Sequence, residues 1–521
     1  CRNSGSRLTV TIEVFAFDSS VRGAFLDGKR GFFNGTCLFL SVGGREHEPS
    51  QVRLVKSKDP RCKDWRAATA MSPGNIDVAG FGTYEVANYD ELIDHPVEMS
   101  EYSDTHFDVF EVPHRLVIAG FHHTEKKRIA KDLKHLCEAH INLFGAPPPF
   151  KNYLFLGLAV GNGYGGLEHR ASSSLIFCRD DLPKKGQTGI SKGYQRFLSL
   201  CSHEYFHAWN MKCIKPKAFT PYRLDQRAHT RLMWVFEGIT SYYQDLMLLR
   251  SKLINPDEYL VRLGKLLTRV YRSPGRFTQS LSDASFDAWD KLYKPNANST
   301  NATISYYSKG ALVALALDLT VRKGSSSTLD QIMQVFWQRF GKNEIGVAED
   351  EFENLSQEIS GLNLDDFFNV SIRGTKDFPL RELMKEFAVD LQFRQGRYGD
   401  ASGLPRKETN QRLDLGFRTN PSTKGLDLTE VIHDGPSERA GLNPGDVLIA
   451  LGGLRVDQSS LPKQLERFNA GETVSVTVFR DDELKEFMVT LAEAIEDTCV
   501  LSFNEQSEDD ALHLRKAWIG K

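Results

Sequence analysis

The sequence predicts a multi-domain protein of the α+β class. Its 521 residues are too many for one hydrophobic core, so several domains are expected. Short alternating or aromatic runs fill residues 7–120, helical spacing dominates residues 191–389, and β-branched runs return after residue 411. Strand-rich and helix-rich stretches that follow one another along a chain are typical of α+β architecture.

The first 120 residues are predicted to form a β-sandwich-like domain. The strand-like runs are LTVTIEVFAF, CLFLSV, FDVFEV and RLVIAGF, and turn-rich clusters such as LDGKRGFFNG and SPGN separate them. The chain enters its first strand pattern with no lead-in, so we expect this domain to be incomplete.

Residues 121–260 are predicted to form a second domain. Apolar residues recur at helical spacing over 124–144, and Gly145 with the following prolines ends that helix. A buried strand is expected at 153–160, a glycine-rich loop at 161–166 and a further strand at 172–177. Helices are expected at 194–211 and 230–250.

The rest of the chain divides at a polar, glycine-containing stretch, residues 394–411, which is predicted to be a linker. Before it, residues 261–393 are predicted to form a helical domain that includes a helix at 309–322. After it, the runs LTEVI, DVLIAL, TVSVTVF and FMVTL predict a β-rich module over residues 412–493.

Composition argues against several classes of protein. The formal net charge is −3, which offers no basic surface for nucleic acid. The eight cysteines form no CxxC pair or close cluster, so we expect reduced, mostly buried thiols and no cysteine zinc site. No apolar run reaches the roughly 18 residues that span a bilayer, and no signal-peptide pattern is present, so a cytoplasmic protein is expected.

The strongest local motif is His203-Glu204-Tyr205-Phe206-His207 within the predicted helix 194–211. Histidines at i and i+4 lie on one face of a helix, so both imidazoles can reach one metal ion. The glutamate between them is placed to deprotonate a metal-bound water, which zinc makes acidic enough near neutral pH.

A catalytic zinc needs a third protein ligand, and Glu237 is the candidate. It lies in the apolar run Trp234-Val235-Phe236-Glu237-Gly238-Ile239, where a carboxylate is costly to bury unless it is paired or bound to a metal. His203, His207 and Glu237 would form a His₂Glu set for one zinc ion.

These residues resemble the glycyl aminopeptidase family, a group of gluzincin metallopeptidases with a thermolysin-like catalytic domain and a C-terminal PDZ domain. The resemblance is carried by GGLEH, HEYFHAWN, WVFEGITSYY and YYSKGALVALALDL, in that order along the chain. It implies that His203, His207 and Glu237 hold zinc and that Glu204 is the general base.

The resemblance also implies roles for residues outside the metal site. Tyr307, or the adjacent Tyr306, would stabilise the tetrahedral oxyanion, because a phenol donates a hydrogen bond where negative charge develops. Gly165 and Gly166 would let backbone approach the substrate, and Glu168 would pair with its free α-ammonium group.

Two positions depart from the wider pattern. His169 follows Glu168, and the sequence gives no role for it. Position 241 is serine, where related enzymes often carry an aspartate that orients a zinc-bound histidine, and Asn210 is a candidate substitute.

The segment 413–491 resembles a PDZ domain, with Leu415-Gly416-Phe417 at the end of its carboxylate-binding loop. Such a domain binds an extended peptide or a protein C-terminus against a sheet edge. The alternative is that the module only packs against the rest of the chain.

The sequence thus predicts a zinc aminopeptidase that acts on peptides with free N-termini. The family resemblance implies a preference for small residues, Gly or Ala. One alternative is an endopeptidase that uses its PDZ domain to recruit protein tails, and Glu168 argues against it. A second is a peptide-binding scaffold with a decayed active site, and the intact residues His203, Glu204, His207, Glu237 and Tyr307 argue against that.

Overall fold

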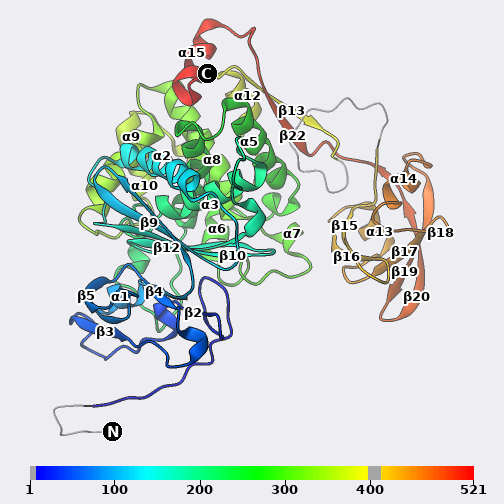
Figure 1. The fold of residues 1–521 in the computed structure, drawn as a ribbon. Helices are drawn as coiled ribbons and strands as arrows, with labels where there is room; N and C mark the ends of the chain where they lie inside the picture. Colours follow the sequence, from blue (N-terminus) through cyan, green and yellow to red (C-terminus); the bar gives the residue numbers. More distant parts are fainter. Residues whose placement is uncertain (1–7, 397–411) are drawn as a thin grey trace. The chain divides into compact units, whose positions relative to one another are not determined.

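Two small antiparallel sheets make up the first hundred residues of the computed structural model, which describes residues 8–396 and 412–521 (Figure 1). One sheet has the order β1-β2-β7-β4 and the other β3-β6-β5. Their core is formed by side chains such as Trp65, Tyr84 and Val97. The elements are β1 (Ala24–Leu26), β2 (Arg30–Phe33), β3 (Ser50–Leu54), β4 (Arg66–Ala68), β5 (Ser72–Ile76), β6 (Gly82–Val86), α1 (Tyr89–Ile93) and β7 (Val97–Ser100).

Two strands predicted in this part are wrong. The described part of the first alternating run, residues 8–17, pairs only through an isolated bridge between Phe17 and Phe25. The run 37–42 has no regular structure beyond the short turn at its start. Alternation makes a strand only where a neighbouring strand accepts its backbone hydrogen bonds. Conversely, the predicted turn cluster 26–35 contains strand β2, because Phe32 and Phe33 are buried.

A five-stranded sheet of order β11-β12-β10-β9-β8 supports the predicted motif helix. Strand β10 lies between β9 and β12 and runs parallel to both, and its apolar side chains are mostly buried. The predictions for 124–144, 153–160 and 172–177 are confirmed. The elements are β8 (Ser103–Val109), β9 (Val112–Ala119), α2 (Lys126–Phe144), β10 (Tyr153–Val160), β11 (Tyr164–Glu168), β12 (Ser172–Cys178) and α3 (Lys192–Phe206).

The chain divides into two compact units, residues 1–213 and 214–521. The second unit begins with a helical region, and α8 is buried along most of its length. The predicted helix 230–250 begins as the π-helical turn η5 and continues as α4. The main elements are η5 (Trp234–Gly238), α4 (Ile239–Arg250), α5 (Pro256–Tyr271), α6 (Leu281–Phe286), α7 (Ser299–Ala302), α8 (Tyr306–Gly324), α9 (Leu329–Phe336), η7 (Trp337–Gly341), α10 (Glu351–Ser360), α11 (Asp365–Phe368), η8 (Asn369–Arg373) and α12 (Leu380–Lys385).

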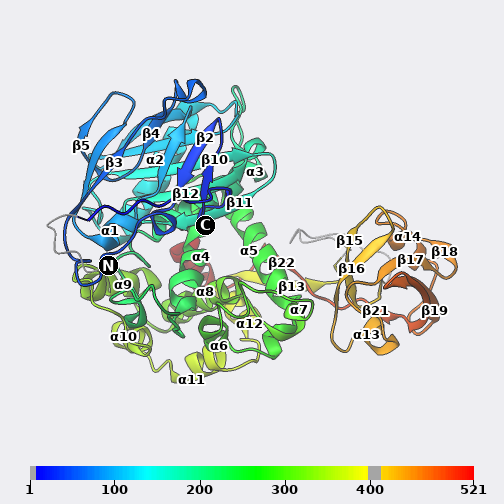
Figure 2. The same cartoon turned by 90° about the horizontal axis from the view of Figure 1, so that it is seen from below.

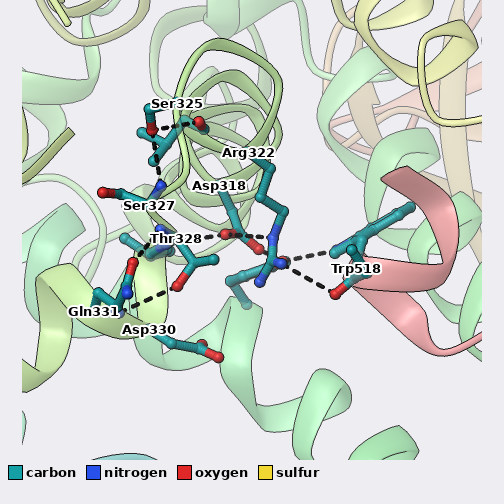
Figure 3. A network of polar contacts seen from close by, with 12 residues as sticks. Asp318, Arg322, Ser325, Ser327, Thr328, Asp330, Gln331 and Trp518 are labelled. Carbon is teal, nitrogen blue, oxygen red and sulfur yellow. Dashed lines mark hydrogen bonds and ion pairs between the residues drawn. The ribbon is translucent and has the colours of Figure 1, made fainter. Parts of the chain in front are cut away.

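A network of polar contacts ties α8 to the last helix, α15 (Asp509–Ile519) (Figure 3). Asp318, fully buried on α8, accepts hydrogen bonds from Arg322 and from the hydroxyl of Tyr242, at 2.9 and 2.8 Å. Trp518 of α15 donates its indole N–H to the same tyrosine hydroxyl at 3.1 Å, and Arg322 donates to the carbonyl of Ala517. The end of the chain is therefore part of the helical region.

The 412–493 module is a twisted sheet of order β15-β16-β17-β19-β20 with two short helices, α13 and α14 (Figure 2). Strand β13 (Val389–Arg394) precedes the module, and β22 (Thr498–Phe503), which follows it, pairs with β13 antiparallel. The elements are β14 (Leu413–Asp414), β15 (Phe417–Pro421), β16 (Leu426–Val431), α13 (Pro436–Ala440), β17 (Val447–Leu451), β18 (Leu454–Arg455), α14 (Leu461–Leu465), β19 (Thr473–Arg480), β20 (Glu483–Thr490) and β21 (Ala492–Glu493).

Three further expectations concern the chain as a whole. Most of the predicted linker, residues 397–411 of 394–411, lies outside the described residues. Cys37, Cys62, Cys137, Cys178, Cys201, Cys213 and Cys499 are free thiols, five of them buried, as expected from their spacing. Within residues 8–396 and 412–521, no helix combines the length and the hydropathy that a membrane crossing requires.

Candidate metal centre and substrate site

Helix α3 carries the first candidate ligand, and the second is the residue that caps its C-terminus. Its apolar stripe is buried as predicted, with Phe197, Cys201 and Tyr205 fully inaccessible, and the side chain of Ser191 caps its N-terminus. His203 is half-buried and His207 is buried. Their Nε2 atoms lie 3.0 Å apart, so both imidazoles present a nitrogen to the same point.

A backbone carbonyl orients His207. Its Nδ1 lies 2.8 Å from the carbonyl oxygen of Asn210, and with the proton on Nδ1 the lone pair of Nε2 is directed to the shared point. Position 241 is not an aspartate, so another group must orient the histidine. The main-chain carbonyl of Asn210, rather than its side chain, makes this contact. The predicted helix 194–211 is shorter than expected: α3 ends at Phe206 because the chain turns here, and Met211 has a φ of 135°.

Glu204 is buried with 4% of its surface exposed, and the helix that carries it is fixed to the sheet beneath. Tyr153 of β10 donates its hydroxyl to the Glu204 carbonyl at 3.3 Å. The hydroxyl of Tyr205 lies 2.9 Å from Nε2 of the buried His114 on β9. These two contacts, from adjacent strands of one sheet, limit the movement of the helix relative to the strands.

Strand β11 holds the predicted substrate residues, so the predicted glycine-rich loop 161–166 is wrong for its second half. Tyr164–Glu168 pairs antiparallel with β12 at the edge of the sheet. A Cβ on Gly166 would lie 2.0 Å from Oε1 of Glu204, whereas a Cβ on Gly165 would meet nothing within 4 Å. The glycine at 166 therefore makes room for the Glu204 carboxylate.

Side chains alternate along a strand, so Glu168 and Gly166 lie on the same face of β11 and Gly165 lies on the other. Glu168, Glu204 and His207 each offer one ligand atom, and these atoms all lie within 4.8 Å of one another. The structure thus brings the predicted amine anchor, the predicted base and one predicted zinc ligand together. The converging Nε2 atoms and the nearby carboxylates are a donor set that fits zinc.

His169, for which the sequence gave no role, is buried with 3% of its surface exposed. Its Nδ1 lies 3.4 Å from a carboxylate oxygen of Asp94. The same carboxylate accepts a hydrogen bond from the backbone N–H of Arg170 at 2.8 Å and pairs with Lys212 at 2.6 Å. Burial disfavours ionisation of Asp94, but Lys212 and His169 outweigh it and hold the pKa of this carboxyl well below its usual range.

The second unit carries Glu237 in the π-helical turn η5, a distortion that is frequent at functional sites. Glu237 is 6% exposed. The next residue, Gly238, packs directly on Gly310 of α8: a Cβ on Gly238 would lie 2.6 Å from the Gly310 Cα. This close approach of the two backbones puts Glu237 beside the start of α8. Its role as the third zinc ligand stays a prediction.

Three tyrosine hydroxyls meet at the start of α8. The hydroxyl of Tyr293 lies 3.0 Å from that of Tyr307 and 3.3 Å from that of Tyr306. Burial, followed by the Glu237 carboxylate, raises the pKa of the Tyr307 phenol well above its usual value. Tyr306 is fully buried and Tyr307 is half-buried, so Tyr307 is the more accessible of the two predicted candidates.

Sequence analysis missed Tyr293 and Asp94. Tyr293 lies 14 residues before Tyr307, and Asp94 lies 75 residues before His169. Neither residue lies in a recognisable local motif. Each meets its partner only in the folded chain, so sequence spacing gives no signal for it.

In the 412–493 module, Leu415 and Phe417 are core residues and Gly416 has a φ of 72°. The Gly416 N–H donates to the carboxylate of Asp414 at 2.9 Å. A peptide carboxylate that bound this N–H would have to displace Asp414, so the predicted carboxylate loop already contains an internal acceptor.

Comparison with protein families gives three matches along the chain. The family model for the M61 peptidase N-terminal domain matches residues 1–101. The model for M61 glycyl aminopeptidase matches residues 196–313, which contain the candidate ligands, the base and the tyrosines. A PDZ domain model matches residues 414–491.

Among solved structures, an aminopeptidase N family protein from Idiomarina loihiensis is 39% identical, with a TM-score of 0.92 over 97% of this chain and 85% of that chain. An M1 zinc metallopeptidase from Deinococcus radiodurans is 14% identical, with a TM-score of 0.47 over 71% of this chain and 75% of that chain. The chain is thus a multi-domain α+β protein with an N-terminal β domain, a helical region and a C-terminal PDZ domain, as the sequence predicted.

Among curated proteins, a probable periplasmic serine endoprotease DegP-like from Marinomonas sp. (strain MWYL1) is 26% identical over 158 residues, which are 30% of this chain. A serine protease Do-like HtrB from Bacillus subtilis is 25% identical over 184 residues. The chain spans about a third of the length of these two relatives, 34% and 37%.

Proposed function

Because the chain belongs to the M61 glycyl aminopeptidase family, we propose that it is a zinc-dependent aminopeptidase. It would hydrolyse the first peptide bond of peptides with a free N-terminus and prefer small N-terminal residues such as Gly or Ala. The observation that carries this proposal is the approach of Glu168 to Glu204 and His207, with ligand atoms within 4.8 Å. A carboxylate so close to the predicted base is suited to hold an α-ammonium group beside the reacting bond.

The proposed ligands of one zinc ion are His203, His207 and Glu237. Zinc, when bound, would act as a Lewis acid that polarises a carbonyl group and lowers the pKa of a bound water to about 7. The protein's part is to hold the two imidazoles: the Nε2 atoms converge at 3.0 Å and the Asn210 carbonyl fixes the ring of His207.

The remaining steps fall to this chain's own side chains. The Glu204 carboxylate takes a proton from the attacking water and later gives it to the leaving amine. The Tyr307 phenol donates a hydrogen bond to the developing oxyanion. Glu168 pairs with the α-ammonium group, so that a peptide lacking that charge binds in the wrong position or not at all.

A pair of substrates tests the proposal. Alanine and glycine chromogenic amides are compared with their N-acetylated twins, with and without a zinc chelator, for the wild type, Glu168→Gln and Glu204→Gln. We expect chelator-sensitive cleavage of the free-amine substrates alone, a loss of kcat/KM in Glu168→Gln and no activity in Glu204→Gln with zinc content unchanged.

Equal cleavage of free and acetylated substrates would instead identify an endopeptidase, for which the PDZ domain would recruit the substrate. Zinc-loaded wild-type protein that cleaved neither class would overturn the proposed reaction.

A further inference from the structure

Asp94 is a buried carboxylate that the proposed reaction does not use. It follows helix α1, and 8% of its surface is exposed. Its carboxylate makes a 2.6 Å ion pair with Lys212, accepts the backbone N–H of Arg170 at 2.8 Å and lies 3.4 Å from Nδ1 of His169. Burying a carboxylate without such partners would be costly. These three contacts therefore hold the Asp94 carboxylate in place.

The two segments that meet at Asp94 each follow a candidate site residue. His169 and Arg170 come directly after Glu168, and the N–H of His169 donates to Ser172 to close the turn between β11 and β12. Lys212 lies in the turn after α3, where its own N–H donates to the carbonyl of His207 at 3.0 Å. One carboxylate therefore joins the turn after the amine anchor to the turn after the second histidine.

We propose that Asp94 is a positioning residue for the substrate amine: it fixes the end of β11, and with it the Glu168 carboxylate, relative to the end of α3. This inference rests on the proposed aminopeptidase function. Glu168 is half-buried at the last position of an edge strand, which in the described part of the chain pairs with a neighbouring strand, β12, on one side only. A shift of about 1 Å at a positioned group can reduce the rate by about a hundredfold.

The chain offers a matched control. Asp90 pairs with the Arg170 guanidinium at 2.6 Å, but its side chain is 39% exposed and this ion pair involves neither His169 nor Lys212. Asp90→Asn removes the same charge from the same neighbourhood without touching the turn backbone. We expect Asp90→Asn to keep kcat/KM within about threefold of the wild type, as for an exposed ion pair.

The test is a double-mutant cycle with Glu168 on the alanine chromogenic amide. We expect Asp94→Asn to lower kcat/KM by about 10- to 100-fold, mainly through KM, with zinc content unchanged. If Asp94 acts through Glu168, the same substitution made in the Glu168→Gln background should cost less than about threefold. Equal fold-losses in the two backgrounds would overturn the proposal and leave Asp94 a structural residue only.

A second variant guards against misfolding. Asp94→Asn combined with Lys212→Met removes both charges of the pair, so no new uncompensated charge is buried. We expect this double variant to lose kcat/KM as Asp94→Asn does, and to lose much less of it in the Glu168→Gln background. Recovery of full kcat/KM would contradict the proposal. A wild type inactive on free-amine substrates would refute the proposed function itself, which the cycle distinguishes from a failure of the positioning role.

Discussion

The contact between Gly166 and Glu204 gives the sharpest test of the site. Alanine at 166 would place its Cβ 2.0 Å from Oε1, 2.4 Å from Cδ and 2.7 Å from Cγ of Glu204. An ordinary contact at this position needs about 3.4 Å, so the carboxylate would have to move by roughly 1.4 Å. Glu204 can make this movement by rotating its side chain, since the clash is with that side chain and not with backbone.

The cost should therefore appear mainly in catalysis. A general base contributes about 10²- to 10⁴-fold, and a displacement of about 1 Å removes much of it. We expect Gly166→Ala to lower kcat by about a hundredfold or more, while overpacking costs about 1–3 kcal/mol of stability. The assay is kcat on saturating alanine chromogenic amide, with the melting temperature and zinc content measured on the same protein.

Gly165→Ala is the matched control. It makes the same chemical change one residue earlier on the same strand, where a Cβ meets nothing within 4 Å. We expect kcat within about threefold of the wild type and a stability equal to or slightly above it, since alanine restricts the unfolded chain. A folded Gly166→Ala protein with wild-type kcat would refute the inferred role of this glycine.

Three further outcomes are expected. Tyr307→Phe should lower kcat by about 10²- to 10³-fold and Tyr293→Phe by about tenfold, because the second hydroxyl acts through the first; a larger effect at Tyr293, measured at saturating substrate, would reverse this order. Gly310→Ala should lower the free energy of unfolding by about 1–3 kcal/mol in urea titrations, because its Cβ would lie 2.9 Å from the Gly238 Cα, and an unchanged midpoint would contradict that packing. The lowered pKa of Asp94 stabilises the folded state above the unfolded value of about 4, and this contribution is lost as the pH falls below it. The stability difference between wild type and Asp94→Asn should thus shrink as the pH falls below about 4; a difference that grew towards acid would show the sign to be wrong.

How far the sequence predicts the site depends on how local each feature is. His203 and His207 are four residues apart on one helix, so helical geometry alone predicts that their imidazoles converge. The buried run of β10 and the amphipathic α3 are local patterns of the same kind, and both are confirmed. The strand at Tyr164–Glu168 was missed because glycine disfavours strands. Glycine is needed at 166 because a side chain there would clash with the Glu204 carboxylate, and sequence spacing does not reveal this neighbour.

The same limit explains the wrong strand at residues 8–17. Its alternating pattern is as strong as that of many real strands, but a strand is a property of two segments, and within the described residues only Phe17 of this run pairs. Asp94 and Tyr293 likewise gain their meaning from partners that the fold supplies, 75 and 14 residues away.

Strands β13 and β22 pair antiparallel, and the PDZ domain is inserted between them in the sequence. Arg394 pairs with Thr498, so the chain leaves for the module and returns from it at neighbouring points. Insertions of this kind are tolerated because they leave the host's own strands and helices continuous in space. A protein made without the module should therefore be built by joining the two strands with a short turn. Stopping the chain after β13 would also delete β22 and α15, and with them the contacts of Trp518 and Ala517 to the helical region, so any loss of activity would say nothing about the PDZ domain.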